Sequence, residues 1–204
     1  MDNIIIRELD PTEQSEARAL IHHNCPVAGQ LMSYSKDAEK IDTFTQIFTQ
    51  NGYKVPDLHT IVLGAYTTDG KLVGALNMNS LLYILEGPID NPQSIEQFNT
   101  VMRMFHGGVL NGIFIDNIGV DLEYRRQGIG QALIEQALSI AKDRLGLHSA
   151  ALASTAPAAT KFFQKMGFTL CKDGLPASFF GGIGSLQLER HYTALGMYYM
   201  LKEL

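Results

Sequence analysis

A strand, a glycine-containing turn and an amphipathic helix follow one another over residues 113–141. Residues 113–120 read IFIDNIGV, an apolar run interrupted by Asn117 and Gly119, which predicts a strand with a bulge. Beyond the turn, apolar side chains recur at helical spacing, and Gly146 is expected to end the helix. The spacing therefore predicts a long helix with one buried face, formed by Ile129, Leu133, Ala137, Ile140 and Ala141.

Short apolar strands and helices alternate along the rest of the chain. Further strands are predicted at residues 4–9, 60–66, 71–78, 150–154, 168–171 and 198–204, with 81–85 as an extension of the third of them. Further helices are predicted at residues 10–23, 35–50, 94–105 and 157–166, and residues 172–196 are expected to form a glycine-rich loop. No repeat or linker interrupts this order, so we expect one α+β domain, an α/β three-layer arrangement, over residues 1–204.

Composition excludes several classes of protein. With 16 Lys and Arg against 21 Asp and Glu, the formal net charge of -5 leaves no broad basic face for nucleic acid. Cys25 and Cys171 lie far apart and outside any C-x-x-C pattern, so we expect neither a disulfide framework nor a metal site. Acidic residues near Met1 and the absence of a long apolar run predict a cytoplasmic protein with no membrane partner.

The turn before the long helix contains Gly128 and Gly130, preceded by Arg125 and Arg126. The first amides of a helix lack intrahelical partners, and glycines let a ligand approach them, so the turn suits a phosphate or pyrophosphate. A helix start that merely needs tight backbone turns is the alternative. The dinucleotide-binding fingerprint does not fit, because Leu133 stands where its third glycine would be.

The pattern Arg125-x-x-Gly128-x-Gly130 resembles the coenzyme A signature of the GNAT superfamily of acyl-CoA-dependent N-acetyltransferases. Residues 162–168, FFQKMGF, are similar to the second signature of that family, an aromatic-rich helix that ends in Gly-Phe. The order of the predicted elements is also similar. The resemblance implies a mixed, mostly antiparallel central sheet of about 6–7 strands flanked by helices, as in the family.

The resemblance also implies a function and a set of cofactor-binding residues. The expected reaction moves an acetyl group from acetyl-CoA to a small-molecule or peptide amine by direct attack in a ternary complex, in a protein that could form a homodimer. The backbone at Ile118 would pair with pantetheine, and an amide near Val120 would polarise the thioester carbonyl. The expected coenzyme A contacts are Ile118, Gly119, Val120, Arg125, Arg126, Gln127, Gly128, Ile129, Gly130, Gln131, Ala159 and Phe163.

The sequence departs from the family pattern where the reaction needs an acid. Ala156 and Phe163 stand where the second signature often has asparagine and tyrosine, and phenylalanine has no proton to give to a departing thiolate. Either the enzyme works without that acid, or the chain is a non-catalytic acyl-CoA-binding or regulatory protein. General acid help is typically worth about 10²–10⁴-fold, so its loss slows an enzyme without abolishing the reaction. Substitute acids are Tyr192 and Tyr198 above all, then Tyr199 and His191.

The general base is expected on the bulged strand. Asp116 lies there, where a carboxylate could reach an amine directly or through water. Glu123, in the approach to the turn, is the second option. A strand residue that is only paired locally is the alternative interpretation of Asp116.

Overall fold

The computed structural model of the protein describes residues 4–24, 46, 49–50, 60–80, 111–154, 157–171 and 198–204. Its strands are β1 (Ile4–Glu8), β2 (Thr60–Thr67), β3 (Leu72–Asn79), β4 (Gly112–Val120), β5 (Ser149–Ser154), β6 (Thr169–Cys171) and β7 (Tyr198–Glu203). Its helices are α1 (Gln14–Asn24), α5 (Ile129–Ser139) and α6 (Pro157–Lys165), with a 3-10 turn η2 (Leu122–Tyr124) and a π-helical turn η3 (Ile140–Arg144).

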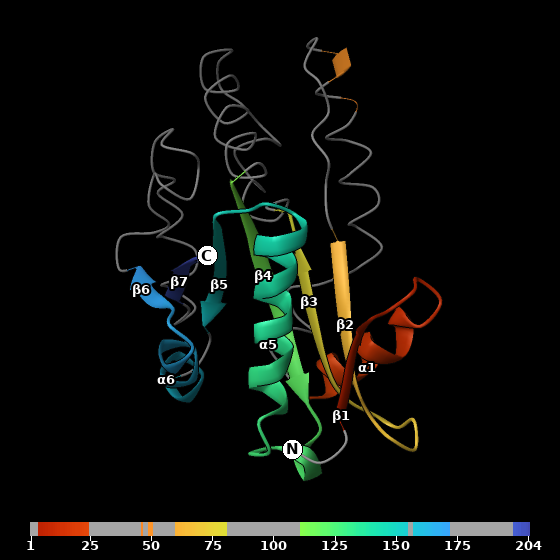
Figure 1. Ribbon diagram of the computed structural model, residues 1–204. Helices are drawn as coiled ribbons and strands as arrows, with labels where there is room; N and C mark the ends of the chain where they lie inside the picture. The colour runs from red at the N-terminus through yellow and green to blue at the C-terminus, as the bar shows by residue number, and fades with distance from the viewer. Residues whose placement is uncertain are drawn as a thin grey trace.

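The seven strands form one sheet in the order β1-β2-β3-β4-β5-β7-β6 (Figure 1). Every neighbouring pair is antiparallel except β4 and β5, which run parallel. The connection from β4 to β5 passes through α5, as a parallel pair requires a crossover. The expected mixed, mostly antiparallel sheet flanked by helices is therefore confirmed.

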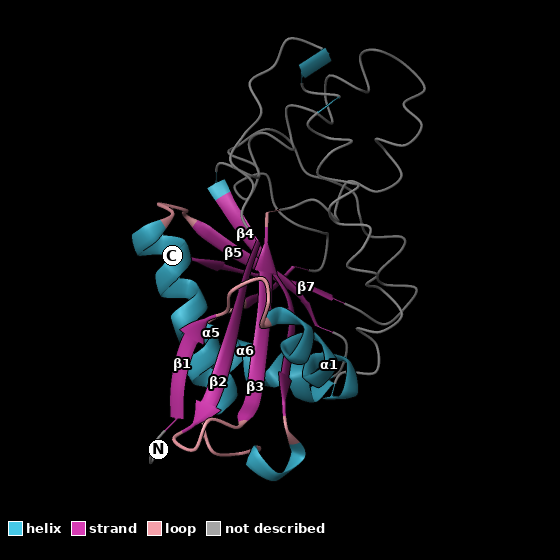
Figure 2. Cartoon of the chain, turned by 90° about the vertical axis from the view of Figure 1, so that its right-hand side faces the viewer, coloured by secondary structure: helices cyan, strands magenta, loops and turns pink. Residues whose placement is uncertain are grey.

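Helices cover both faces of the sheet. α5 and α6 pack on one face, where Leu133 and Phe163 join a core with Leu76 and Met78 of β3. α1 packs on the other face, where Ala17 and Ile21 meet residues that include Val62 and Ala75. Figure 2 shows α1 and α5 on opposite sides of the strands. Burying each of the larger apolar side chains among them contributes about 1.5–3 kcal/mol, so the helices are held by packing more than by local propensity.

Two helix ends differ from the expectation from sequence. α1 begins at Gln14 and not at Asp10, because the preceding residues form a turn in which the Glu13 amide donates to the Asp10 carbonyl at 2.9 Å. The Glu13 carboxylate is held in place by Arg7 of β1 and by the Asp10 amide. The long helix expected to run to Gly146 is α-helical only to Ser139 and continues as the π turn η3.

The hairpin of β2 and β3 and the strands after residue 111 lie where the sequence predicts them. The extension at residues 81–85, the helix at 94–105 and the loop at 172–196 fall outside the described residues, as does most of the helix at 35–50. Among the described residues, no helix is long and apolar enough to cross a membrane.

The ion pair between Arg7 and Glu13 makes a testable prediction. The hydrogen bond from Arg7, aided by the Asp10 amide, lowers the pKa of Glu13 from 4.5 to about 2. Because the folded-state pKa lies below the unfolded value, the pair stabilises the fold above about pH 4.5, and this contribution is lost as the pH falls towards 2. NMR titration of the Glu13 carboxyl should give a midpoint near 2, and Arg7→Gln should return it towards 4.5. An ordinary Glu13 midpoint in the unmutated protein would contradict the pairing.

Candidate functional site

β4 and β5 separate in the middle of the sheet. They pair from Gly112 and Ser149 as far as Ile115 and Leu152. β5 pairs with β7 along its whole length, and beyond Ile115 β4 continues to Val120 paired only with β3 among the described strands. Figure 1 shows β5 ending well before β4, with α6 beyond its end. The edge of residues 116–120 that faces β5 therefore has no partner strand among the described residues. Such an edge can hydrogen-bond to an extended ligand as a further strand would.

A bulge coincides with this separation. Met78 of β3 pairs with Ile115 and Asn77 pairs with Asn117, so Asp116 is an extra residue in β4. The sequence predicted a bulge in this strand, and the structure places it at Asp116. A bulge bends its strand and redirects side chains, which turns the Asp116 carboxylate towards β3.

The Asp116 carboxylate is held by two buried amides of β3. The Nδ2 atoms of Asn77 and Asn79 donate to Asp116 Oδ2 at 3.3 and 3.2 Å. Both asparagines are almost completely buried, with 1% and 2% of their surface exposed. They lie two and four residues after Ala75, on the sheet face that α1 covers. The sequence analysis missed these two asparagines, although polar residues at alternate positions of an apolar strand were a signal.

The turn from β4 into α5 presents backbone amides. The Asp121 amide donates to the Val73 carbonyl at 2.9 Å, which holds the start of the turn to β3. Arg126 and Gly128 then adopt left-handed φ values of 63° and 83°. The helical bond from Ala132 to the Gly128 carbonyl, at 3.0 Å, marks the start of α5.

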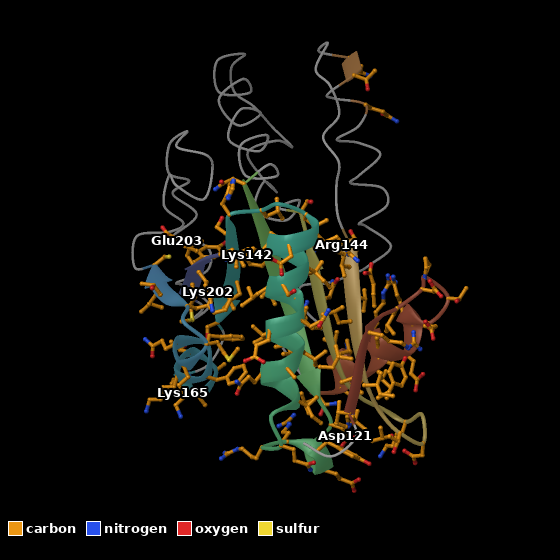
Figure 3. The ribbon with its side chains drawn as sticks, viewed as in Figure 1. Asp121, Lys142, Arg144, Lys165, Lys202 and Glu203 are labelled. Atoms are coloured by element: carbon orange, nitrogen blue, oxygen red, sulfur yellow. The ribbon has the colours of Figure 1, made fainter. Side chains whose placement is uncertain are left out.

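The amides of residues 129–131 therefore have no acceptor within the helix and carry its positive dipole end. Figure 3 shows Asp121 at the end of the molecule where α5 begins, opposite Lys142 and Arg144. This arrangement can bind an anion such as a pyrophosphate.

Gly130 lies where α5, α6 and the end of β4 meet. A Cβ built on it would lie 3.7 Å from Phe162 and 3.8 Å from both Ile118 and Val120, which is ordinary contact. The structure thus brings together Ile118, Val120 and Gly130, three of the residues predicted to contact coenzyme A. Phe162, which the sequence analysis did not single out, is the nearest side chain to that Cβ.

Phe163 and Ala159 lie on the inner side of α6. The Phe163 side chain is 7% exposed and packs in the core, with its ring centroid 5.2 Å from that of Phe162 and 6.0 Å from that of Phe168. Ala159 is partly buried against the same core. The Phe163 ring is thus mainly a core residue in this structure, and a contact with coenzyme A stays a prediction.

Arg125 joins the turn to α1. Its Nε donates to the Val120 carbonyl at 3.0 Å, and its Nη2 donates to the side chain and the carbonyl of Asn24, at 3.2 and 3.4 Å. Asn24 is the last residue of α1, where the helix dipole favours a cation. Arg126, Gln127 and Gln131 are exposed. The side chain of Arg125 therefore braces the turn, whereas Arg126 is exposed and holds a left-handed backbone conformation within it.

The candidate acids and the second candidate base differ in where they lie relative to the described residues. Tyr192 lies outside the described residues. Tyr198 is the first residue of β7, where its backbone pairs with Ser154 of β5. Tyr199 is buried, with its ring 6.3 Å from that of Phe114. Glu123 is exposed, and its Oε2 atom lies 4.0 Å from the Nζ atom of Lys71. Among the described residues, no group of His, Cys, Asp and Glu could hold a metal ion.

Comparison with known proteins identifies a family. The sequence model described as the acetyltransferase (GNAT) family matches residues 30–168. A GNAT family acetyltransferase from Elizabethkingia anophelis, with acetyl-CoA bound, has a TM-score of 0.54 and 14% identity, and the match covers 100% of both chains. No curated protein sequence matches the chain.

Two further solved structures resemble the chain over nearly its whole length. A mutant agmatine N-acetyltransferase in its apo form has a TM-score of 0.56 and 16% identity, over 99% of this chain and 100% of the other. A Bacillus subtilis acetyltransferase in complex with CoA has a TM-score of 0.52 and 16% identity, over 99% of each chain. At this identity, the likeness to these structures shows the fold.

Gly119 makes a prediction about how α1 and β4 are packed. A Cβ at Gly119 would lie 2.9 Å from the Cα of Ile21, so α1 can approach the end of β4 only because the residue is glycine. Gly119→Ala should therefore destabilise the fold by about 1–3 kcal/mol in urea denaturation. Gly130→Ala is the matched control, because its Cβ meets only ordinary contacts and should change stability by less than about 0.5 kcal/mol. Equal stability of the two variants would contradict the close approach.

Proposed function

Since the chain belongs to the acetyltransferase (GNAT) family, we propose that it moves an acetyl group from acetyl-CoA to a primary amine by direct attack in a ternary complex. The observation that carries the proposal is the position of Asp116. Its carboxylate lies at the bulge where β4 leaves β5, on the same strand that leads into the anion-binding turn. In this proposal, the base and the binding site for the acyl donor lie on one continuous segment.

The described residues suit coenzyme A. The amides of Ile129, Gly130 and Gln131 would bind its pyrophosphate, with Arg126 adding positive charge. The unpaired edge of β4 at residues 116–120 would hydrogen-bond the pantetheine arm. When bound, acetyl-CoA supplies an activated acetyl group as a thioester. Two of the similar solved structures hold acetyl-CoA or CoA, which supports this choice of donor.

The amine needs a base. An alkylamine has a pKa near 10.4, so at pH 7 only about one molecule in 10³–10⁴ carries the free lone pair that attacks. In our proposal the Asp116 carboxylate accepts a proton from the ammonium, directly or through water. The nitrogen lone pair then forms the new bond to the acetyl carbon, and the carbon–sulfur bond breaks with its electron pair on sulfur. Overall, an ammonium and the thioester give an amide, a thiol and one released proton.

A backbone amide near Val120 would polarise the thioester carbonyl during attack. The proton for sulfur has no assigned donor on α6, because Phe163 carries no hydroxyl. A thiol has a pKa near 8.5, so the thiolate is a tolerable leaving group without an acid. We propose Tyr192 and Tyr198 as the residues to test for this role.

The second candidate is a protein that binds acyl-CoA without catalysis, favoured by the core position of Phe163. Thiol release measured with alkylamines, polyamines, amino acids, aminoglycosides and peptide amines separates the two. Turnover with any amine supports the enzyme. Saturable acetyl-CoA binding without turnover on the whole panel supports the binding protein.

Charge at the turn should control donor binding. Gly130→Glu adds bulk and a negative charge beside the amides of α5, so it should weaken acetyl-CoA binding by about tenfold or more in titration calorimetry. Gly130→Ala adds only a methyl group at ordinary contact distance from its neighbours, so this variant should bind acetyl-CoA nearly as tightly as the unmutated protein does. Circular dichroism confirms that each variant is folded. Unchanged affinity in folded Gly130→Glu would contradict the assignment of the turn.

Removing the carboxylate should affect catalysis and spare donor binding. Asp116→Asn keeps the shape of the side chain and should lower kcat by about 10²–10⁴-fold, with the dissociation constant of acetyl-CoA unchanged. The residual rate should rise with pH, because the free fraction of the amine then limits the reaction. Asp143→Asn, in η3 beyond the C-terminal end of α5, is the control for an exposed carboxylate and should retain the full rate. A full rate in Asp116→Asn would remove Asp116 from the mechanism.

A further inference from the structure

Two buried oxygens beside Asp116 have no hydrogen-bond donor among the described residues. The Oδ1 atoms of Asn77 and Asn79 are both buried, and neither has a hydrogen-bond partner in the part of the chain that the structure describes. A buried polar atom without a partner is costly and marks a place where a donor from outside the chain belongs. Here two such acceptors occur on neighbouring positions of one strand face, next to a carboxylate.

The orientation of the two amides follows from their shared partner. The nitrogen of each amide donates to Asp116 Oδ2. Rotating either amide by 180° would place its carbonyl oxygen against the carboxylate, which repels it and loses the hydrogen bond. Both Oδ1 atoms therefore point away from the carboxylate, and they offer a ligand two carbonyl oxygens close to a carboxylate.

The chemistry of these atoms selects the ligand. A group that satisfies them needs several N–H or O–H donors, and a positive charge would favour it beside the carboxylate. An anion or an apolar group would leave the oxygens unpaired. A divalent metal fits poorly, because such ions are bound mostly by several carboxylates and water, and Asp116 is the one carboxylate that the described residues place against these amides. A primary ammonium group has three donors and one positive charge, which matches two carbonyl oxygens and a carboxylate.

We propose that Asn77 and Asn79 determine acceptor specificity by accepting hydrogen bonds from the ammonium group of an unhindered primary alkylamine. This inference rests on the proposed function, since it names the substrate class of the same site. The two amides then act twice: their nitrogens orient the base, and their oxygens hold the nitrogen that the base deprotonates. Quaternary amines are rejected because they have no N–H donor for the buried oxygens, and uncharged amines bind more weakly because they lack the positive charge that the carboxylate attracts.

Binding tests the proposal without any turnover. n-Butylammonium is titrated into protein saturated with CoA, and the side-chain amide signals of Asn77 and Asn79 are followed by NMR with labelled asparagine. These signals should shift and saturate with n-butylammonium, and should not shift with butyltrimethylammonium, which lacks N–H donors, or with 1-butanol, which lacks the charge. Equal responses to all three probes, or no response to n-butylammonium, would overturn the proposal.

Kinetics tests the same residues in the reaction. Asn77→Ala and Asn79→Ala should each raise KM for n-butylamine by about 10- to 100-fold and leave KM for acetyl-CoA unchanged. Methoxyamine, which is uncharged at neutral pH, should be used nearly as well by the variants as by the unmutated protein. Ser149→Ala removes a buried hydroxyl at the start of β5, away from the Asp116 bulge. It is the control for a general loss of packing and should leave KM for n-butylamine unchanged.

The possible failures are distinguishable. If no amine in the panel releases thiol, the proposed function fails, whereas the NMR titration still reports on the ammonium site. If n-butylamine is acetylated but its KM is the same in both asparagine variants, the specificity proposal fails and the proposed function stands. Should a variant fail to fold, the titration of the unmutated protein decides alone.

Discussion

The bulge at Asp116 is the constraint on which the rest of the site depends. One extra residue in β4 follows directly after the last pair between β4 and β5, so the strand bends where its partner leaves it. Two consequences come from the same distortion. The edge of β4 is left open beyond Ile115, and the Asp116 carboxylate is turned towards Asn77 and Asn79 on the face that α1 covers. A regular strand would provide neither.

Contacts from both faces hold the far end of β4 in place. α1 approaches Gly119 on one face, and α5 approaches Gly74 of β3 on the other, where a Cβ would lie 3.0 Å from Ile129. Arg125 hydrogen-bonds to Asn24 at the end of α1, and the Nζ atom of Lys71 lies 4.8 Å from the ring centroid of Tyr124 in the turn. The amides of the turn are therefore braced before any ligand binds, which reduces the entropy cost of binding.

The sequence predicted the elements more fully than their contacts. Periodicity and turn residues identified the hairpin, the bulged strand, α5 and the short helix α6, because these features are local. Asn77 and Asn79 were missed, since their role depends on the register that places β3 against Asp116, and register is a property of two distant segments. The same reason applies to Phe162 and Phe163. These residues are adjacent in one helix, and only the fold shows that Phe162 is the one nearer to Gly130.

The partners of Asp116 explain how one carboxylate could serve a cationic substrate. An arginine or lysine at hydrogen-bond distance would hold the carboxylate more strongly, but it would also neutralise its charge and repel an ammonium. The two asparagine amides orient the carboxylate through neutral hydrogen-bond donors. Their oxygens, which have no hydrogen-bond partner among the described residues, carry a cost that an ammonium with N–H donors would relieve on binding in the proposed complex. In that proposal, affinity for the acceptor arises in part from groups that are incompletely satisfied without it, and the register of β3 against β4 is what brings these groups together.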